Sequence, residues 1–363
     1  AEIIPLVGLG GCSRVRKAHI LSALDIGYRY FDTAQAYNWG YKEEDVGEAI
    51  HESSVDRDDI YVQSKIHPQD LGYHSTKQAV SHSLRRLQLD ALDSMLIHKP
   101  RCWGDICQKT PEGTWQDSWV ALEELYDEGI IHAIGICDVD DALLDELLTQ
   151  RITPHVIQNW MDPFRQDVHI RQRCKEEGIQ YQAYSSLGNQ WFHHRGYTEN
   201  PVLNHPTLVS IAQKYGVDVA QIVINWATRH GVAVIPASTN PTRQESNLNS
   251  FDFDLTEKEM LLIDSLDGKP PPPSPPTKSP EDPNKVSVVF QNQGHLKLKS
   301  YWIGSSNEEV HVGEIGAKDS MVLDSFHGHT FIFRNEGGEF VGQHTINKDH
   351  GSMQQHLVAD SEL

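Results

Sequence analysis

The chain lacks the features that would direct it to a membrane or to nucleic acid. None of its apolar runs approaches the roughly 20 residues that a membrane-spanning helix needs. Lysine and arginine number 31 against 51 aspartates and glutamates among 363 residues, a formal net charge of −20. Phosphate binding needs clustered positive side chains, so this balance argues against nucleic acid and anionic membranes as partners. Solubility is the simplest explanation of the acidic composition.

Cysteine is scarce, and its spacing excludes two common uses. The five cysteines form no CxxC pair and show no zinc-ligand spacing. Their odd number predicts reduced thiols without disulfides, as is usual in the cytosol. The N-terminal stretch AEIIPLVGLGGC is also short for a secretory signal peptide. We therefore expect a cytoplasmic protein. The five are Cys12, Cys102, Cys107, Cys137 and Cys174.

Residues 1–268 alternate short apolar runs with amphipathic stretches. The alternation repeats eight times, which predicts an α/β fold of the (β/α)8 TIM barrel type, eight parallel strands each followed by a helix. The alternative is a doubly wound open sheet, in which a GxGxxG turn is expected after the first strand. The GLGG stretch from Gly8 to Gly11 lacks that spacing. The expected strands are 5–9, 28–32, 60–65, 93–98, 131–136, 154–159, 179–184 and 232–236.

Residues 269–284, KPPPPSPPTKSPEDPN, interrupt this alternation with eight prolines. Proline fixes φ and has no backbone N–H to donate, so neither helix nor sheet is expected. The segment predicts a stiff polyproline-type linker between two domains. A ligand for an SH3 or WW domain is the alternative interpretation of the same prolines.

Residues 285–363 change to an alternation of period two. The segments VSVVFQNQ, HLKLKSYWIG, SMVLDSF, HTFIFRN and EFVGQHTI are separated by turns rich in Gly, Asn, Ser and His. This pattern predicts a small all-β domain, an antiparallel β-sandwich.

Four polar residues of the first domain fall where predicted strands end: Asp32, Tyr37, Lys65 and His98. The carboxyl ends of barrel strands meet on one face, so we expect these side chains to lie together. Carbonyl reduction needs a proton on oxygen as well as a hydride on carbon, and Tyr37 is the expected acid. We expect Lys65 to lower the pKa of Tyr37 and Asp32 to keep Lys65 charged. His98 orients the carbonyl oxygen.

At these residues the chain resembles the aldo-keto reductases over about residues 3–266. The segment GYRYFDTAQAY, followed by Glu43 and Val46-Gly47, carries the resemblance. The family usually spans the distance from this tyrosine to the glutamate in about half as many residues. The sequence Asn38-Trp39-Gly40 is therefore a small insertion, and we expect Trp39 to line the substrate pocket. Cys12 stands where the family usually has a tryptophan and is the second expected pocket residue.

The resemblance implies a nicotinamide cofactor. Gln158 matches the glutamine that holds the carboxamide, and Tyr184 matches the tyrosine that stacks on the ring. Ser185 and Leu187 follow Tyr184 as further cofactor contacts. The family's Ser-Asn pair reads Cys137-Asp138 here, and Asp138 can accept a hydrogen bond from the carboxamide amine but cannot donate one when ionised.

The segment VIPASTNPTRQESN corresponds to the part of the family that binds phosphate and adenine. Ser238, Arg243 and Asn247 match, whereas Ala237 and Ser246 replace the usual lysine and glutamate. The guanidinium of Arg243 suits a 2′-phosphate. NADP(H) is therefore the expected cofactor, with NAD(H) as the alternative.

The second domain resembles the β-domain of the von Hippel-Lindau tumour suppressor over Val286–Val358. Tyr301-Trp302 and the segment SFHGHTFIFR carry this resemblance. It implies a peptide site at Trp302, Ser325 and His329, although Phe331 replaces a tryptophan of that pocket. A module that packs on the barrel or mediates assembly is the simpler interpretation, and it is preferred here to peptide binding.

The sequence as a whole predicts a cytoplasmic, NADPH-dependent reductase of aldehydes and ketones with a C-terminal interaction module. The expected partners are a small-molecule carbonyl substrate and a peptide or protein on the β-domain. The alternative is a reductase-like scaffold with weak or no turnover, because Cys137, Asp138 and Ala237 depart from the family's cofactor site. His193-His194 has no third ligand nearby in the sequence, so no metal site is expected.

Overall fold

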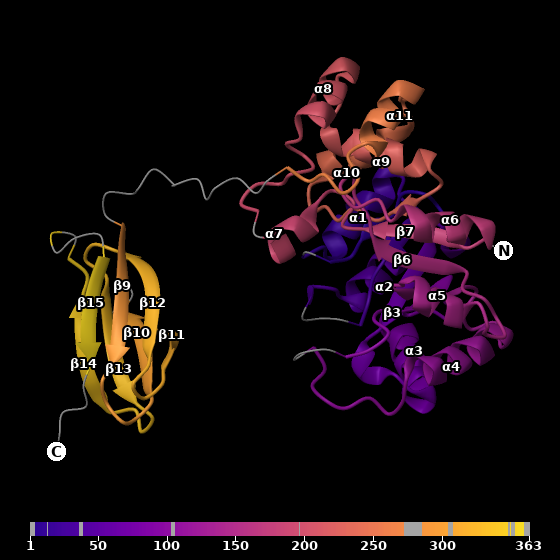
Figure 1. Ribbon diagram of the computed structural model, residues 1–363. Coiled ribbons are helices and arrows are strands. Elements are labelled where there is room, and N and C mark those ends of the chain that lie inside the picture. Colours follow the sequence, from indigo (N-terminus) through magenta and orange to yellow (C-terminus); the bar gives the residue numbers. More distant parts are fainter. Residues whose placement is uncertain are drawn as a thin grey trace. The chain divides into compact units, whose positions relative to one another are not determined.

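Figure 1 shows the computed structural model of the chain. It describes residues 4–12, 14–35, 39–102, 106–195, 197–271, 285–303, 308–347, 349 and 353–358. The chain divides into two compact units, Ala1–Ser274 and Pro275–Leu363, here named the barrel unit and the β unit.

Eight parallel strands form the centre of the barrel unit, and they pair in chain order from β1 to β8. Val7 and Val234 form a parallel bridge that brings the last strand back to the first. The amide of Gly8 donates to the carbonyl of Val234 at 2.9 Å across the same seam. The predicted (β/α)8 architecture is confirmed. The strands are β1 (Leu9–Gly10), β2 (Tyr30–Asp32), β3 (Tyr61–Ile66), β4 (Ser94–Ile97), β5 (Ile134–Cys137), β6 (Val156–Trp160), β7 (Gln180–Tyr184) and β8 (Ala233–Val234).

Helices surround these strands (Figure 1). Capping side chains start several of them; Thr114, for example, accepts from the amide of Asp117 and begins α4. Their apolar faces pack on the barrel, where Trp119 and Trp226 are fully buried. The helices are α1 (Lys17–Ile26), α2 (Glu43–Glu52), α3 (Tyr73–Leu87), α4 (Trp115–Asp127), α5 (Asp141–Leu147), α6 (Val168–Glu176), α7 (Asn189–Arg195), α8 (Pro206–Tyr215), α9 (Val219–Arg229), α10 (Pro241–Leu248) and α11 (Glu257–Asp264). No helix in the described part of the chain is long and apolar enough to cross a membrane.

The β unit contains two sheets, with strand orders β11-β10-β13-β14 and β12-β9-β15. Alternate residues of both sheets point to one shared core, which includes Phe290, Leu298 and Phe333. The sequence predicted antiparallel pairing throughout, and this was wrong for one pair, because β15 runs parallel to β9. The strands are β9 (Lys285–Asn292), β10 (Leu298–Ile303), β11 (Glu309–Ile315), β12 (Ser320–Phe326), β13 (Thr330–Asn335), β14 (Phe340–Thr345) and β15 (Met353–Val358).

The expectation of reduced cysteines was wrong for one pair. Cys102 and Cys107 form a disulfide with their Cα atoms 5.9 Å apart. The total number of cysteines says nothing about two that are close in sequence, because a short loop can bring them to bonding distance. Cys12, Cys137 and Cys174, which are all described, are not in a disulfide. A disulfide is typical of oxidising compartments, so the cytoplasmic location stays a prediction.

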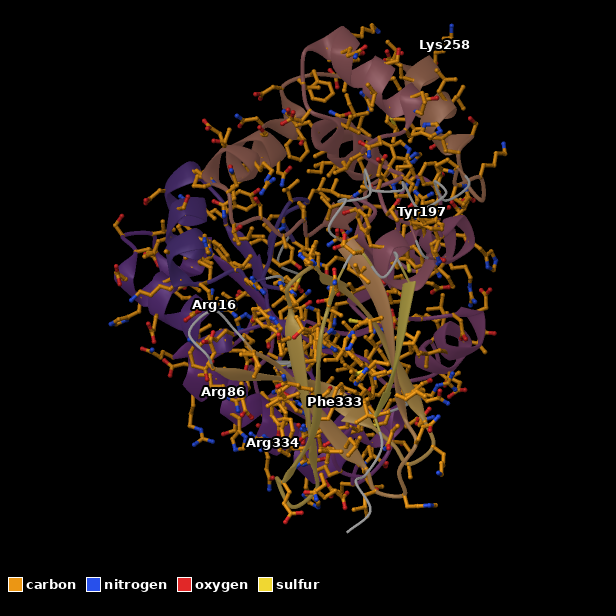
Figure 2. All side chains as sticks on the ribbon, turned by 90° about the vertical axis from the view of Figure 1, so that its left-hand side faces the viewer. Arg16, Arg86, Tyr197, Lys258, Phe333 and Arg334 are labelled. Atoms are coloured by element: carbon orange, nitrogen blue, oxygen red, sulfur yellow. A yellow bond between two sulfur atoms is a disulfide. The ribbon has the colours of Figure 1, made fainter. Side chains whose placement is uncertain are left out.

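The proline-rich linker lies mostly outside the described residues. Of the segment 269–284, only 269–271 are described. The carbonyl of Pro271 accepts from the hydroxyl of Tyr197 at 2.6 Å, so the linker leaves the barrel unit beside the residue labelled in Figure 2.

Gly47 allows α2 to approach the end of α3, and we expect Gly47→Ala to destabilise the barrel unit. A Cβ atom at this position would lie 2.3 Å from the carbonyl oxygen of Leu87, which is backbone and cannot rotate away. Overpacking of this kind costs about 1–3 kcal/mol in unfolding free energy. Urea unfolding of the variant measures it, with Glu48→Ala on the exposed face of the same helix as the control. Equal stability of both variants would contradict the close approach.

Candidate active site

The carboxyl ends of the strands bring the predicted site residues together. Asp32 is the last residue of β2, Lys65 is next to last in β3, and His98 directly follows β4. All three are buried. Tyr37, the predicted acid, lies outside the described residues.

Asp32 and Lys65 form an ion pair whose two side chains are both fully buried. The Nζ atom of Lys65 donates to Oδ1 of Asp32 at 2.5 Å and to the carbonyl of Thr33 at 3.0 Å. In the described part of the chain, the buried Oδ2 of Asp32 and Oγ1 of Thr33 have no hydrogen-bond partner. Unpaired buried oxygens beside an ammonium are expected where a ligand or water binds.

His98 is enclosed by aromatic rings and cations. The ring of Trp39 lies edge-on to it, with 4.9 Å between ring centres. Burial, reinforced by the positive charges of Lys65 and Lys99, lowers the pKa of His98 well below 6.5. The imidazole is therefore neutral near pH 7 and can donate one hydrogen bond. Its Nδ1 has no partner among the described residues.

A hydrogen-bonded set of glutamines fills the barrel below the ion pair. Nε2 of Gln63 donates to Oδ1 of Asp32 at 2.7 Å and to Oε1 of Gln182 at 2.8 Å. Gln158 also donates to Gln182 and, at 3.3 Å, to Asp32. Gln182 in turn donates to the hydroxyl of Tyr30. The amide nitrogen of Gln158, predicted to hold a cofactor carboxamide, is thus engaged inside the barrel, and its Oε1 is 3.7 Å from Sγ of Cys137.

Asp138 sits at the centre of a second polar group at the same end of the barrel. Its backbone is left-handed, with φ of 59°, a conformation that Asp and Asn tolerate better than most residues. One carboxylate oxygen pairs with Lys99, and the other accepts from the hydroxyl of Tyr184 at 2.9 Å. The ammonium of Lys99 also lies 5.5 Å from the centre of the Tyr184 ring.

Cys137 and Cys12 flank this mouth. Cys137 is buried, and burial raises the pKa of its thiol to about 12, so it is a neutral thiol rather than a thiolate. Cys12 is a partly buried thiol in the turn after β1.

The turns after β7 and β8 hold the remaining predicted residues. Ser185 has a left-handed backbone with φ of 53°, and the amide of Gly188 donates to its carbonyl. Leu187 is partly buried, and in the described part of the chain the buried Oγ of Ser186 has no partner. Ser238 and Asn247 are buried, whereas Arg243 is exposed in the first turn of α10.

The sequence reasoning missed several residues of this site. Gln63 and Gln182 could have been found, because each lies two residues from a predicted site residue on its strand and so faces the same way. Lys99 could have been found because it adjoins His98. Tyr41, whose ring lies 5.8 Å from that of His98, had no signal in the motif.

In the β unit, the three residues predicted to bind a peptide lie together. Oγ of Ser325 and Nδ1 of His329 are 2.9 Å apart. The rings of Trp302 and His329 are 5.2 Å apart between centres. Within the described residues, the buried Nε1 of Trp302 has no acceptor. The side chains of His193 and His194 are outside the described residues.

Comparison with known proteins places the barrel unit among reductases. Residues 14–268 match the model of the Aldo/keto reductase family. The chain is 37% identical over 248 residues to a glyoxal reductase of Bacillus subtilis (strain 168), covering 68% of this chain and 82% of that protein. It is 35% identical over 293 residues to an NADPH-dependent D-xylose reductase of Meyerozyma guilliermondii, covering 73% of this chain and 91% of that protein.

The fold comparison agrees. The crystal structure of an aldo-keto reductase from a Medee basin deep-sea metagenome library superposes with a TM-score of 0.64 at 33% identity, covering 74% of this chain and 93% of that one. The aldo/keto reductase from Brucella melitensis gives 0.63 at 33% identity, with 73% and 95% covered.

The environment of His98 predicts a pH dependence of stability. Its pKa is lower in the folded chain than the ordinary value of 6.5, so the unfolded chain takes up a proton there first as the pH falls. The stability that neutral His98 supports is present above about pH 6.5 and is lost below it, with a slope of at most about 1.4 kcal/mol per pH unit. Urea unfolding at pH 7.5, 6.0 and 5.0 should show a smaller loss for His98→Gln than for the wild type. Parallel losses in both proteins would contradict the expected shift.

Proposed function

The chain belongs to the aldo/keto reductase family, and we propose that it reduces aldehydes and ketones to alcohols with NADPH as the hydride donor. The relatives named glyoxal reductase and D-xylose reductase support small carbonyl compounds as the substrate class. The observation that carries the proposal is the buried Asp32–Lys65 pair beside neutral His98 at the barrel mouth. A desolvated cation and a neutral donor are suited to the negative charge that develops on a carbonyl oxygen.

The residues present fit a nicotinamide cofactor. Tyr184 is partly exposed and offers a ring face, and Asp138 beside it can accept from a carboxamide amine. Ser186 lies between Ser185 and Leu187, the two expected cofactor contacts, and among the described residues its buried Oγ has no hydrogen-bond partner. When bound, the reduced nicotinamide supplies the hydride that goes to the carbonyl carbon.

Adenosine and its 2′-phosphate are expected at α10. Exposed Arg243 lies in the first helical turn, where the macrodipole also favours an anion. Ser238 precedes that helix, and Asn247 follows Arg243 by one turn. The relative named NADPH-dependent supports the same preference.

The protein's own side chains then handle the oxygen and its proton. His98 donates a hydrogen bond to the carbonyl oxygen, and Lys65 stabilises the negative charge of the group that gives up the proton. Asp32 orients the ammonium of Lys65 by accepting a hydrogen bond from it. The sequence assigned the donor role to Tyr37.

Lys99 compensates for the unusual Asp138. A carboxylate next to the nicotinamide would stabilise the positively charged oxidised ring over the neutral reduced ring. Pairing with Lys99 opposes that bias, because the two charges are in direct contact. The replacement of the family's Ser-Asn pair is therefore compatible with reduction.

We also propose that the β unit binds an extended peptide, as its resemblance to the von Hippel-Lindau β-domain implies. The contacts among Trp302, Ser325 and His329 favour this second role, since they place an aromatic wall beside two polar groups. In the described part of the chain, the buried Nε1 of Trp302 is a donor without an acceptor.

Arg243→Gln should weaken NADPH binding at least tenfold and leave NADH binding unchanged. The loss of a charge-assisted hydrogen bond to the 2′-phosphate costs about 1.5–3 kcal/mol, and NADH has no such phosphate. Quenching of tryptophan fluorescence measures both affinities, and NADPH oxidation with glyoxal measures turnover. Glu245→Gln, exposed on the same helix, is the matched control. A wild-type chain that binds neither cofactor would reject the reductase and favour the scaffold alternative.

Peptide binding by the β unit should depend on Trp302. We expect the full chain to bind some members of an array of extended, proline-containing decapeptides. The Trp302→Ala variant should no longer bind those same peptides. Ser325→Ala, which removes one hydroxyl, should weaken them less. Binding that is equal for the wild type and Trp302→Ala would reject this site.

A further inference from the structure

Tyr41, which the sequence motif did not indicate, lies beside Lys65. The Nζ atom of Lys65 lies 5.1 Å from the centre of the Tyr41 ring. The His98 ring lies 5.8 Å from the Tyr41 ring at an interplanar angle of 80°. Tyr41 is partly buried, so its side chain is enclosed without being sealed from a substrate.

The surroundings of the Tyr41 hydroxyl place it at the barrel mouth. Burial raises the pKa of Tyr41 well above 10. The electrostatic effects of four neighbours raise it further: Cys12, Asp32, Cys137 and Tyr184. These residues come from the ends of β1, β2, β5 and β7. Tyr41 is therefore within electrostatic range of groups at the ends of four strands.

The backbone on both sides of Tyr41 is anchored. Arg16 donates through Nη1 to the carbonyl of Gly40 at 2.9 Å. On the other side, Glu43 is fully buried and begins α2. The hydroxyls of Ser64 and Ser83 both donate to Oε1 of Glu43 at 2.6 Å.

The anchor at Glu43 is tied directly to the catalytic strand. Ser64 precedes Lys65 on β3, and successive strand residues face opposite sides. Lys65 therefore points into the barrel while Ser64 holds α2 from outside. Arg86 of α3 adds a contact of 3.2 Å to the other oxygen of Glu43, and both arginines of this arrangement, Arg16 and Arg86, are labelled in Figure 2. Tyr41, two residues before Glu43, is thus held at a set distance from Lys65.

We propose that Tyr41, rather than Tyr37, donates the proton to the carbonyl oxygen. The proposal rests on the reductase function proposed above and names the acid of that site. Two electrons reach the carbonyl carbon as the hydride, the C–O π bond becomes a lone pair on oxygen, and the Tyr41 O–H bond breaks as the proton joins that oxygen. The tyrosinate left behind is stabilised by the Lys65 ammonium and regains a proton from solvent.

The high pKa of Tyr41 is compatible with this role. The hydroxyl keeps its proton at neutral pH until an alkoxide, which is a stronger base than a phenolate, forms next to it. The same hydroxyl and neutral His98 together give the oxygen two hydrogen-bond donors.

The test compares Tyr41→Phe with the matched variant Tyr37→Phe in the full-length chain. Each change removes one hydroxyl, and thermal unfolding checks that both variants fold. We expect Tyr41→Phe to lower kcat with glyoxal by 10²-fold to 10⁴-fold, about the contribution of a general acid, with NADPH affinity unchanged. Tyr37→Phe should stay within about tenfold of the wild type, well short of the loss of a general acid.

Benzoate binding to the NADP+ complex gives a second readout that does not depend on turnover. A carboxylate oxygen at the carbonyl position accepts from the donor hydroxyl, so calorimetry should show affinity for benzoate at least about tenfold weaker in Tyr41→Phe, and unchanged in Tyr37→Phe. Retained kcat or retained benzoate affinity in Tyr41→Phe overturns the proposal. A wild-type chain without NADPH binding or turnover overturns the reductase function itself, which is a distinct result.

Discussion

The ion pair between Asp32 and Lys65 is the constraint on which the barrel interior depends. Both side chains are fully buried, and ions in such a place lose their hydration at a cost of several kcal/mol each. Removing one partner of a buried pair typically costs about 3–5 kcal/mol, because the other is left charged and unpaired. The pair is therefore retained only if the surrounding groups satisfy it.

The polar interior of the barrel follows from this requirement. The carbonyl of Thr33 accepts from Lys65, and the amides of Gln63 and Gln158 donate to Oδ1 of Asp32, which leaves Oδ2 without a partner among the described residues. Gln182 then satisfies those amides and reaches Tyr30, so one polar chain runs through a space that branched apolar residues usually fill. Because each member is oriented by its neighbours, the ammonium of Lys65 is held in place before any substrate arrives.

The sequence predicted the features that depend on periodicity. It did not predict those that depend on contacts between particular residues or on the direction of a strand. Eight alternations of strand and helix were enough for the barrel, and the strand-end rule was enough to place Lys65 and His98 at the ends of β3 and β4, while their roles stay predictions. The Cys102–Cys107 bond was missed because a count of cysteines has no spatial content. The parallel pairing of β15 with β9 was missed because period two is the same in parallel and antiparallel strands.

The choice between two nearby tyrosines shows where motif spacing stops being informative. Counting from the strand, Tyr37 is the residue that the segment GYRYFDTAQAY suggests. On the helix side, Glu43 begins α2 and fixes the position of the preceding residues. Its carboxylate accepts from Ser64, which is next to Lys65. An insertion between β2 and α2 changes which residue lies a given number of positions after the strand. It does not change which residue lies just before the helix, because buried hydrogen bonds hold the start of α2 to β3. The helix-side anchor is therefore the observation on which we base the proposal that the Tyr41 hydroxyl reaches the substrate.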